Sequence, residues 1–315
     1  MSERSGVGLV ELAILEALDA LGAQPGQPYQ PNAMVLAAVE DLIGLAPGYA
    51  YEVLLDLGRP WTMPVSLISP CGNFGSRGHD QAADFRYTES GLTQAGQVVL
   101  AAERGELAPV PVGLINGNTH RGGTRPPFRP QGIIEALRQV SWHCGLSDAE
   151  LAALVGPPEF GNGCTVTGDF AALAAGRGTI LRLEARVSVG EDSVVIENLP
   201  PNANPDDTAA DIANRARPHD WASRYPALHQ QALLPLKDLR DESRAATDTD
   251  RLVCVPKAGT SPDQLRDQLI DVYGVHTTVE VTLPQPLAVM LRGWVGAHQD
   301  EDLPASLASL QDAIP

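Results

Sequence analysis

Apolar residues in the N-terminal part of the chain recur every three or four positions, which is the spacing of helices with one buried face. This pattern predicts three short helices, over residues 9–21, 34–43 and 49–57. A glycine follows each helix as a stop signal, namely Gly22, Gly44 and Gly58.

Shorter elements follow the third helix. A strand is predicted over residues 65–69, a glycine-rich loop over 72–78, and an interrupted helical stretch over 82–102. Three helices followed by a strand-bearing segment fit a winged helix-turn-helix, although many other small folds share that order. Pro109 and Pro111 then mark a candidate domain boundary.

The pattern beyond that boundary favours strands. Residues 179–189 alternate between apolar and polar side chains, which is typical of a half-buried strand. The turn at 190–192 leads into a second strand over 193–199, so a hairpin is predicted. The remaining predictions are helices over 206–216, 261–274 and 286–298, strands over 251–255 and 276–283, and a weakly ordered acidic tail. The chain is therefore predicted to be α+β, with mostly antiparallel strands in its second part.

Composition narrows the class of protein. The chain has 22 basic and 39 acidic residues, a formal charge of −17, which opposes binding to a polyanion unless the basic residues are segregated. No run of eighteen apolar residues is present and the first residues do not resemble a secretory signal, so we expect no membrane span and a cytoplasmic location. The four cysteines are far apart and are expected to be inert, and the neighbours His143 and Cys144 are a weaker candidate dyad.

One segment carries the most specific pattern in the chain. Residues 71–92 read CGNFGSRGHDQAADFRYTESGL, with a Gly-Asn-Phe-Gly-Ser loop at 72–76 and Arg-Tyr-Thr-Glu at 86–89. This pair of motifs resembles the A subunits of the bacterial type IIA topoisomerases, DNA gyrase and topoisomerase IV. Further blocks follow in the family's order at 114–117, 156–160, 176–179, 197–200 and 238–243. Together the blocks span most of residues 5–295.

The resemblance implies a fold and a division of the chain. It implies a winged-helix breakage-reunion domain over 1–108, an α+β tower domain over 109–285, and a helical stub with an acidic tail over 286–315. In the family, the chain continues into a long coiled coil with an exit gate and a DNA-wrapping domain. We therefore expect a truncated and divergent member, in which residues 286–298 resemble the start of the coiled coil.

The resemblance also implies a chemistry. Tyr87 occupies the position of the tyrosine that attacks a DNA phosphodiester, on a helix that follows the glycine-rich loop. A phenol has a pKa near 10 and is a poor nucleophile at neutral pH, so it needs a neighbouring base or cation. Arg86 is expected to stabilise charge at the reacting phosphorus. The chain itself is expected to hold no cofactor or metal, because Mg²⁺ and ATP belong to a partner B subunit, and the family's A subunits act as homodimers on double-stranded DNA.

Each candidate residue has a plainer alternative. A lone tyrosine is usually a packing residue, and Asn73 and Ser76, the candidate DNA contacts in the glycine-rich loop, are also suited to shaping that loop. Arg121, Arg125 and Arg129 lie in a basic stretch that could hold a nucleic-acid backbone. The alternative there is a solvated loop whose arginines pair with the chain's surplus carboxylates.

The departures from the family pattern favour a second function. The family's DNA-gripping lysine and His-Arg-Arg cluster align with Gly8, Glu11, Leu12 and Ala13, and its His-Pro-His-Gly-Asp motif is replaced at 45–49 by Leu-Ala-Pro-Gly-Tyr. Residues 1–105 hold five basic and twelve acidic side chains. The alternative to a DNA-breaking subunit is therefore a catalytically degenerate paralogue that acts through protein contacts. A third interpretation, an unrelated α+β binding module, leaves the ordered blocks unexplained.

Overall fold

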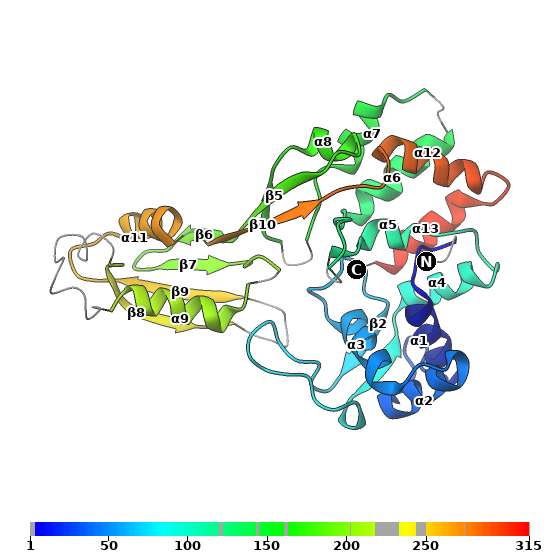
Figure 1. The fold of residues 1–315 in the computed structure, drawn as a ribbon, viewed down its shortest axis with the longest axis horizontal. Coiled ribbons are helices and arrows are strands. Elements are labelled where there is room, and N and C mark those ends of the chain that lie inside the picture. The colour runs from blue at the N-terminus through cyan, green and yellow to red at the C-terminus, as the bar shows by residue number, and fades with distance from the viewer. Residues whose placement is uncertain are drawn as a thin grey trace.

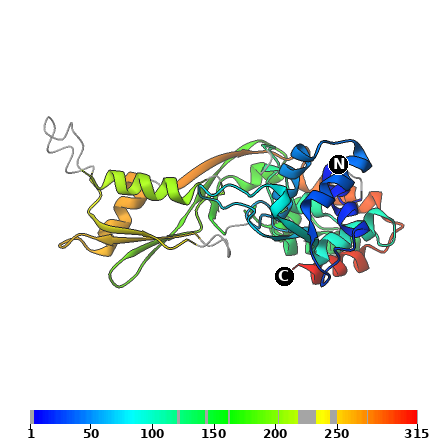
Figure 2. The same cartoon turned by 90° about the horizontal axis from the view of Figure 1, so that it is seen from below.

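The structure is a computed structural model that describes residues 4–119, 122–142, 145–160, 163–201, 203–217, 233–243, 250–273 and 275–314. Two parts lie end to end along the longest axis (Figures 1 and 2). The larger part holds both termini, and strands β5 and β10 lead from it to the smaller part (Figure 1).

The N-terminal region contains the three predicted helices. They are α1 (Leu9–Ala20), α2 (Asn32–Ile43) and α3 (Pro47–Gly58). Gly44 ends α2 in the left-handed conformation, with φ of 69°, which is the role expected of a glycine stop. Strands β1 (Gln30–Pro31), β2 (Ile68–Cys71) and β3 (Glu89–Leu92) form an antiparallel sheet in the order β1-β3-β2.

The prediction of a helical stretch over 82–102 is wrong in its first half. Residues Phe85–Tyr87 form one turn of 3-10 helix (η1), β3 follows, and only Gln94–Glu103 form a helix, α4. Thr93 caps α4, its hydroxyl accepting a hydrogen bond from the Gly96 N–H. Ser90, Gly91 and Leu92 are buried, so this segment is extended against β2 and has no exposed helical face.

The middle of the chain adds helices that the hydrophobic spacing did not predict. They are α5 (Val112–Asn116), α6 (Pro130–Trp142), α7 (Asp148–Val155) and α8 (Phe170–Ala174). A second sheet of antiparallel strands, in the order β10-β5-β4, lies beside them: β4 (Thr165–Thr167), β5 (Thr179–Glu184) and β10 (His276–Val281).

The alternating run over 179–189 is not a single strand. It divides at Ala185 into β5 and β6 (Arg186–Val189), which belong to different sheets. The predicted hairpin is confirmed, because Val189 of β6 pairs with Val194 of β7 (Val194–Glu197). Alternation shows which face of a strand is buried but not which sheet the strand joins. The division at Ala185 could therefore not be predicted from the pattern.

The smaller part is a sheet in the order β6-β7-β9-β8, covered by two helices. Its remaining elements are β8 (Leu236–Asp241), β9 (Arg251–Pro256), α9 (Pro205–Arg215) and α11 (Pro262–Gln268), which continues into a π-helical turn over Leu269–Tyr273. The predicted Ser261 cap is present as a full capping box with Gln264. The predicted end of this helix, Gly274, lies outside the described residues.

Two hydrophobic clusters hold the molecule together. The larger runs from Val7 to Leu310, and so draws on all three of the predicted segments. The smaller lies between the four-stranded sheet and its two helices, and includes Ile196, Ile212, Leu252 and Leu265. The division at 108/109 and 285/286 stays a prediction, while packing separates residues of about 185–275 from the rest.

The prediction of a weakly ordered tail is wrong. After α12 (Leu287–Ala297), residues Leu303–Ala313 form α13. Leu303, Leu307 and Leu310 recur at helical spacing and are buried, the last two within the larger cluster, while Asp302 caps the helix by accepting from the Ala305 N–H. Acidic residues flank this buried face. The prediction of a weakly ordered tail gave weight to those charges and overlooked the helical spacing of the leucines.

The α+β class is confirmed. Among the described helices no single one is long and apolar enough to cross a membrane, although α2 and α3 together reach that length and composition across a bend of 116°.

Candidate functional site

Tyr87 ends the 3-10 turn in the long connection between β2 and β3. Its side chain is 76% exposed, and its backbone N–H donates to the Asp84 carbonyl at 2.8 Å. The phenol therefore stands on a short hydrogen-bonded turn with its hydroxyl open to solvent. It is not a packing residue, and a phosphate could reach it from outside.

A buried polar network supports this turn from beneath. Thr88 is buried, and its hydroxyl accepts from the Asn32 amide at 2.8 Å and lies 3.1 Å from the Tyr51 hydroxyl. Tyr51 donates to the Ala83 carbonyl at 2.7 Å, and burial raises the pKa of its phenol. Buried polar groups with several partners hold one geometry, so the backbone beside Tyr87 is fixed on its inner side.

Arg86 does not present a free charge beside the phenol. Its guanidinium makes two hydrogen bonds to Asp84, Nε to Oδ1 at 2.8 Å and Nη2 to Oδ2 at 2.9 Å. The same hydrogen bonds, with one from the Arg86 backbone N–H, lower the pKa of Asp84 to about 2. The expected charge stabiliser is thus occupied by a neighbouring carboxylate at neutral pH.

Asn73 and Ser76 shape the loop. The Asn73 Oδ1 accepts from the Gly75 N–H at 2.7 Å, and the Ser76 hydroxyl accepts from the Gly78 N–H at 3.1 Å. Gly72 has φ of 95°, and a Cβ there would stand 3.2 Å from the Tyr87 carbonyl, so the loop passes directly against the turn. The structure brings these residues and Tyr87 together, while contact with DNA stays a prediction.

Every arginine in residues 1–105 is in an ion pair with a carboxylate. The pairs are Arg4–Glu301, Arg59–Asp56, Arg77–Asp250, Arg86–Asp84, and Arg104 with both Glu16 and Asp19. Each of these cations would have to exchange its carboxylate for a phosphate before it could hold DNA. The surface around Tyr87 is therefore not a preformed positive groove.

The basic stretch lies on a different segment. Arg121 is outside the described residues. Arg125 is half-buried, which lowers the pKa of its guanidinium, and it borders a small cavity together with Glu11. Arg129 is exposed just before α6. The Arg125 N–H donates to the Asn118 side chain within the segment, and the Thr124 carbonyl accepts from the Thr282 N–H.

Sequence patterns missed the residues that hold the site. Asp84 had a usable signal, because a carboxylate two positions before an arginine at a turn suggests a local pair. Asn32 and Tyr51 had none, since they reach Thr88 only through the packing of α2 and α3 against the turn that carries Tyr87.

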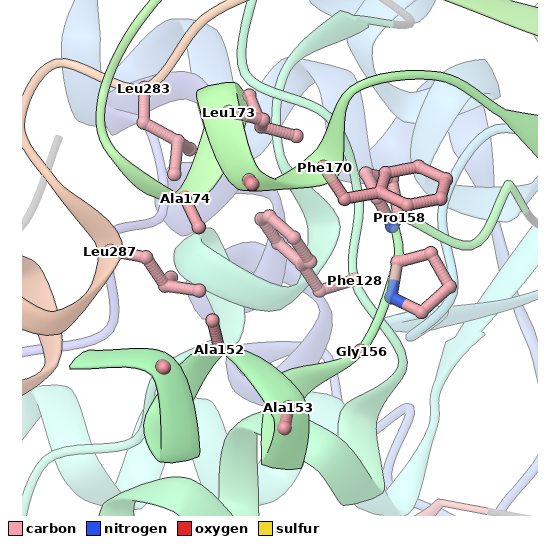
Figure 3. Close-up of a pocket in the computed structure, with 13 residues that line it drawn as sticks. Phe128, Ala152, Ala153, Gly156, Pro158, Phe170, Leu173, Ala174, Leu283 and Leu287 are labelled. Carbon is pink, nitrogen blue, oxygen red and sulfur yellow. The ribbon is translucent and has the colours of Figure 1, made fainter. Parts of the chain in front are cut away.

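The apolar cavity in the larger part of the molecule offers no catalytic groups. Within the described residues no three His, Cys, Asp or Glu side chains gather in a way that could hold a metal ion. A cavity of about 430 Å³ lies between α7, α8 and the start of α12 (Figure 3). Its lining is apolar, with Phe128, Phe170, Leu173, Leu283 and Leu287 around several alanines, so it has no side chain for acid–base chemistry.

Comparison with known proteins shows which proteins the chain is similar to. The chain is 27% identical over 278 residues to the A subunit of DNA topoisomerase 4 from Neisseria gonorrhoeae, covering 76% of this chain and 36% of that protein. It is 26% identical over 290 residues to the DNA gyrase A subunit of Chlamydia muridarum, covering 79% of this chain and 33% of the relative. This chain is related in sequence to the A subunits of DNA gyrase and topoisomerase IV.

A further relative, the DNA gyrase A subunit of a Nocardioides species, is 28% identical over 293 residues, covering 79% of this chain and 30% of that protein. No family model matches the chain. The chain spans about a third of the length of these gyrase and topoisomerase relatives, so the resemblance found in the motifs is confirmed as a distant one over most of this chain.

Proposed function

We propose that the chain is a type IIA topoisomerase A-like subunit in which Tyr87 breaks and rejoins DNA together with a B-type subunit. The observation that carries the proposal is the exposure of the Tyr87 phenol on a hydrogen-bonded turn inside the Arg-Tyr-Thr-Glu motif. The relatives' A-subunit names support the same assignment.

The reaction is a transesterification. The Tyr87 oxygen attacks a DNA phosphorus and loses its proton to a base, a 5′-phosphotyrosine bond forms, and the 3′ oxygen leaves and takes up a proton. Because one phosphodiester replaces another, the reverse reaction rejoins the strand. Arg86 would stabilise the charge on the phosphorus after exchanging Asp84 for a phosphate oxygen. In the proposed complex the B subunit supplies Mg²⁺ and ATP.

The N-terminal elements support a winged-helix interpretation. Their order is α1, β1, α2, α3, β2, β3, and the β2–β3 connection that carries Tyr87 corresponds to the wing. The part made of β6–β9, α9 and α11 corresponds to the tower, and α12 to the start of the coiled coil. Homodimerisation and a cytoplasmic location belong to the same proposal.

A specific observation favours the alternative of a degenerate paralogue that acts through protein contacts. The five arginines of residues 1–105 are all engaged by carboxylates, which removes the grip on phosphate that a breakage domain needs. The exposed phenol is then a remnant of the parent chemistry.

Covalent trapping distinguishes the two functions. The chain is mixed with a cognate B subunit, Mg²⁺ and supercoiled DNA at low salt, and denaturant is added. The enzyme function predicts protein-linked DNA that disappears in Tyr87→Phe, with Tyr49→Phe as a control because Tyr49 is equally exposed on α3. Absence of trapped DNA from the wild type, with a co-purifying protein partner, would establish the alternative.

A further inference from the structure

Arg77 leaves the Tyr87-bearing loop and enters the smaller part of the molecule. Its side chain is only 4% exposed, although it comes from a surface connection. The guanidinium pairs with the Asp250 carboxylate, itself 5% exposed, and donates to the carbonyls of Leu199 at 2.8 Å and Pro200 at 2.6 Å. A buried arginine with this many oxygen partners is held in one position.

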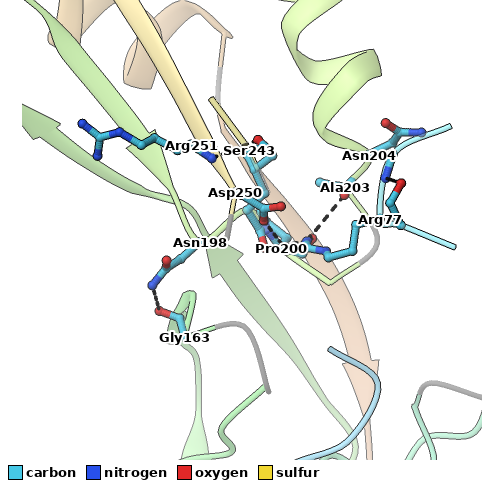
Figure 4. Close-up of polar contacts among 12 residues, drawn as sticks. Arg77, Gly163, Asn198, Pro200, Ala203, Asn204, Ser243, Asp250 and Arg251 are labelled. Atoms are coloured by element: carbon cyan, nitrogen blue, oxygen red, sulfur yellow. Dashed lines mark hydrogen bonds and ion pairs between the residues drawn. The ribbon is translucent and has the colours of Figure 1, made fainter. Parts of the chain in front are cut away.

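The receiving loop is shaped for a cation. After β7 the chain turns at Asn198, a non-glycine residue with φ of 55°, whose amide donates to the Gly163 carbonyl at 3.0 Å. The turn aims successive carbonyls toward the guanidinium (Figure 4). Burial raises the pKa of the Asp250 carboxyl, and the adjacent Arg77 charge opposes that rise. Removing either partner would leave a buried charge without compensation.

A second contact lies directly beside the first. The His79 N–H donates to Asp206 Oδ2 at 2.8 Å at the start of α9, and the His79 ring lies 3.1 Å from Asp207. A Cβ at Gly78 would overlap Asp206 Oδ2, so a larger residue there would displace the Asp206 side chain. Two adjacent points of the loop are thus attached to the smaller part.

These attachments are linked mechanically to Tyr87. The loop is closed on itself by the Ala83 N–H, which donates to the Asn73 carbonyl at 2.9 Å, and by the Ser76 N–H, which donates to the Asp80 carbonyl at 3.0 Å. Its base passes against the Tyr87 carbonyl at Gly72. A displacement of Arg77 would therefore be transmitted through a short, internally bonded loop to the turn that carries the phenol.

We propose that Arg77 and Asp250 are positioning residues that fix the Tyr87 turn relative to the four-stranded sheet of the smaller part. The proposal rests on the proposed function for its consequence, the alignment of the phenol, but the clamp itself is a property of the chain alone. Arg77 contacts no reacting atom, and it acts through the loop.

Hydrogen–deuterium exchange of the full chain tests the clamp without DNA. In Arg77→Gln and in Asp250→Asn, amide exchange over residues 72–88 is expected to rise at least about tenfold, because the loop loses its attachment. Arg77→Lys keeps the charge without the planar fork and is expected to give an intermediate rise. The matched control is Arg240→Gln, which removes an exposed, ion-paired arginine from the same sheet. Unchanged exchange in both clamp variants would overturn the proposal.

Cleavage assays test the consequence. With a B subunit and Mg²⁺, Arg77→Gln is expected to lower the rate of covalent trapping at least about tenfold while DNA affinity stays within about twofold, since misplacement of the nucleophile affects the chemical step. Equal trapping by wild type and variant, despite faster exchange, would overturn the positioning role. If the wild type traps no DNA, the proposed function fails, and the exchange measurement still decides the clamp.

Discussion

At the scale of single residues, the contact between Asp84 and Arg86 decides how much charge the Tyr87 site offers. The hydrogen bonds from Arg86 hold the pKa of Asp84 at about 2, below the ordinary value for a carboxyl group. A lowered folded-state pKa means that the pair is intact above about pH 4 and is lost only as the pH falls toward 2. No change of pH within the physiological range can therefore release Arg86 from Asp84, although a phosphate could compete with Asp84 for the guanidinium.

Substitution can release Arg86 where pH cannot. Asp84→Asn keeps the oxygen that accepts from the Arg86 backbone N–H but removes the negative charge. We expect tighter DNA binding, with the slope of log affinity against log salt steeper by about one, because one more phosphate contact becomes available. Fluorescence anisotropy with a short duplex measures both. Asp238→Asn, the same change beside Arg240, serves as the control and is expected to leave the slope unchanged. Equal slopes in wild type and Asp84→Asn would contradict the expectation.

Three cysteines differ in reactivity for a physical reason. Burial raises the pKa of the Cys164 thiol to about 11 and that of Cys254 to about 12, and the thiolate is the reactive form. Cys71 is exposed at the end of β2. At pH 8 we expect a thiol reagent to modify Cys71 in the native chain, and Cys164 and Cys254 only after denaturation. Peptide mapping by mass spectrometry reads each site separately, and rapid native labelling of Cys254 would contradict its burial.

At the scale of elements, the close approach of α4 to the chain before β2 requires a glycine. A Cβ at Gly96 would stand 2.2 Å from the Leu67 carbonyl oxygen, and neither backbone can yield without moving its element. Gly96→Ala is expected to cost about 2–4 kcal/mol of unfolding free energy.

The matched control lies in α12. Gly293 is exposed, and a Cβ there meets no atom within 4 Å. Gly293→Ala is expected to stabilise the chain by about 0.5–1 kcal/mol through helix propensity alone. Urea unfolding of both variants checks the pair, and a Gly96→Ala variant as stable as the wild type would show that α4 does not pack closely against Leu67.

Local sequence signals determined part of this architecture. The three N-terminal helices, the 189–194 hairpin and the Ser261 cap follow from spacing and capping chemistry, which act over a few residues. The extended segment after Tyr87 could not be predicted from such local signals. Ser90 and Gly91 join the sheet through pairing with β2 and β1, and that pairing depends on distant residues. The buried face of α13 was readable but was obscured by the surrounding acids.

At the scale of the whole molecule, charge counting predicts a weak hold on DNA, and the ion pairs of the structure add a physical reason for the same prediction. The −17 charge is a property of the sequence, whereas the pairing of Arg4 with Glu301 and of Arg77 with Asp250 joins residues 297 and 173 positions apart. Such pairs cannot be read from spacing. Because of these pairs, the few arginines of residues 1–105 are not only scarce but also neutralised by carboxylates.

The salt dependence of DNA binding by the chain alone measures how many arginines are still available to contact phosphate. Arg129 and Arg138 have no carboxylate partner within the described residues, whereas the arginines of residues 1–105 are engaged. Each phosphate contact contributes about 0.9 to the slope of log affinity against log salt, so we expect a slope no steeper than about −3 for a short duplex.

Variants test which arginines are responsible. The double variant Arg129→Gln, Arg138→Gln should bring the slope toward zero, while Arg59→Gln, which removes a paired arginine, should leave it unchanged. A slope steeper than about −6 would mean that phosphate displaces the carboxylates around Tyr87 readily. The paired arginines would then be a reserve of DNA contacts rather than a loss of them, and the breakage function would gain over the paralogue.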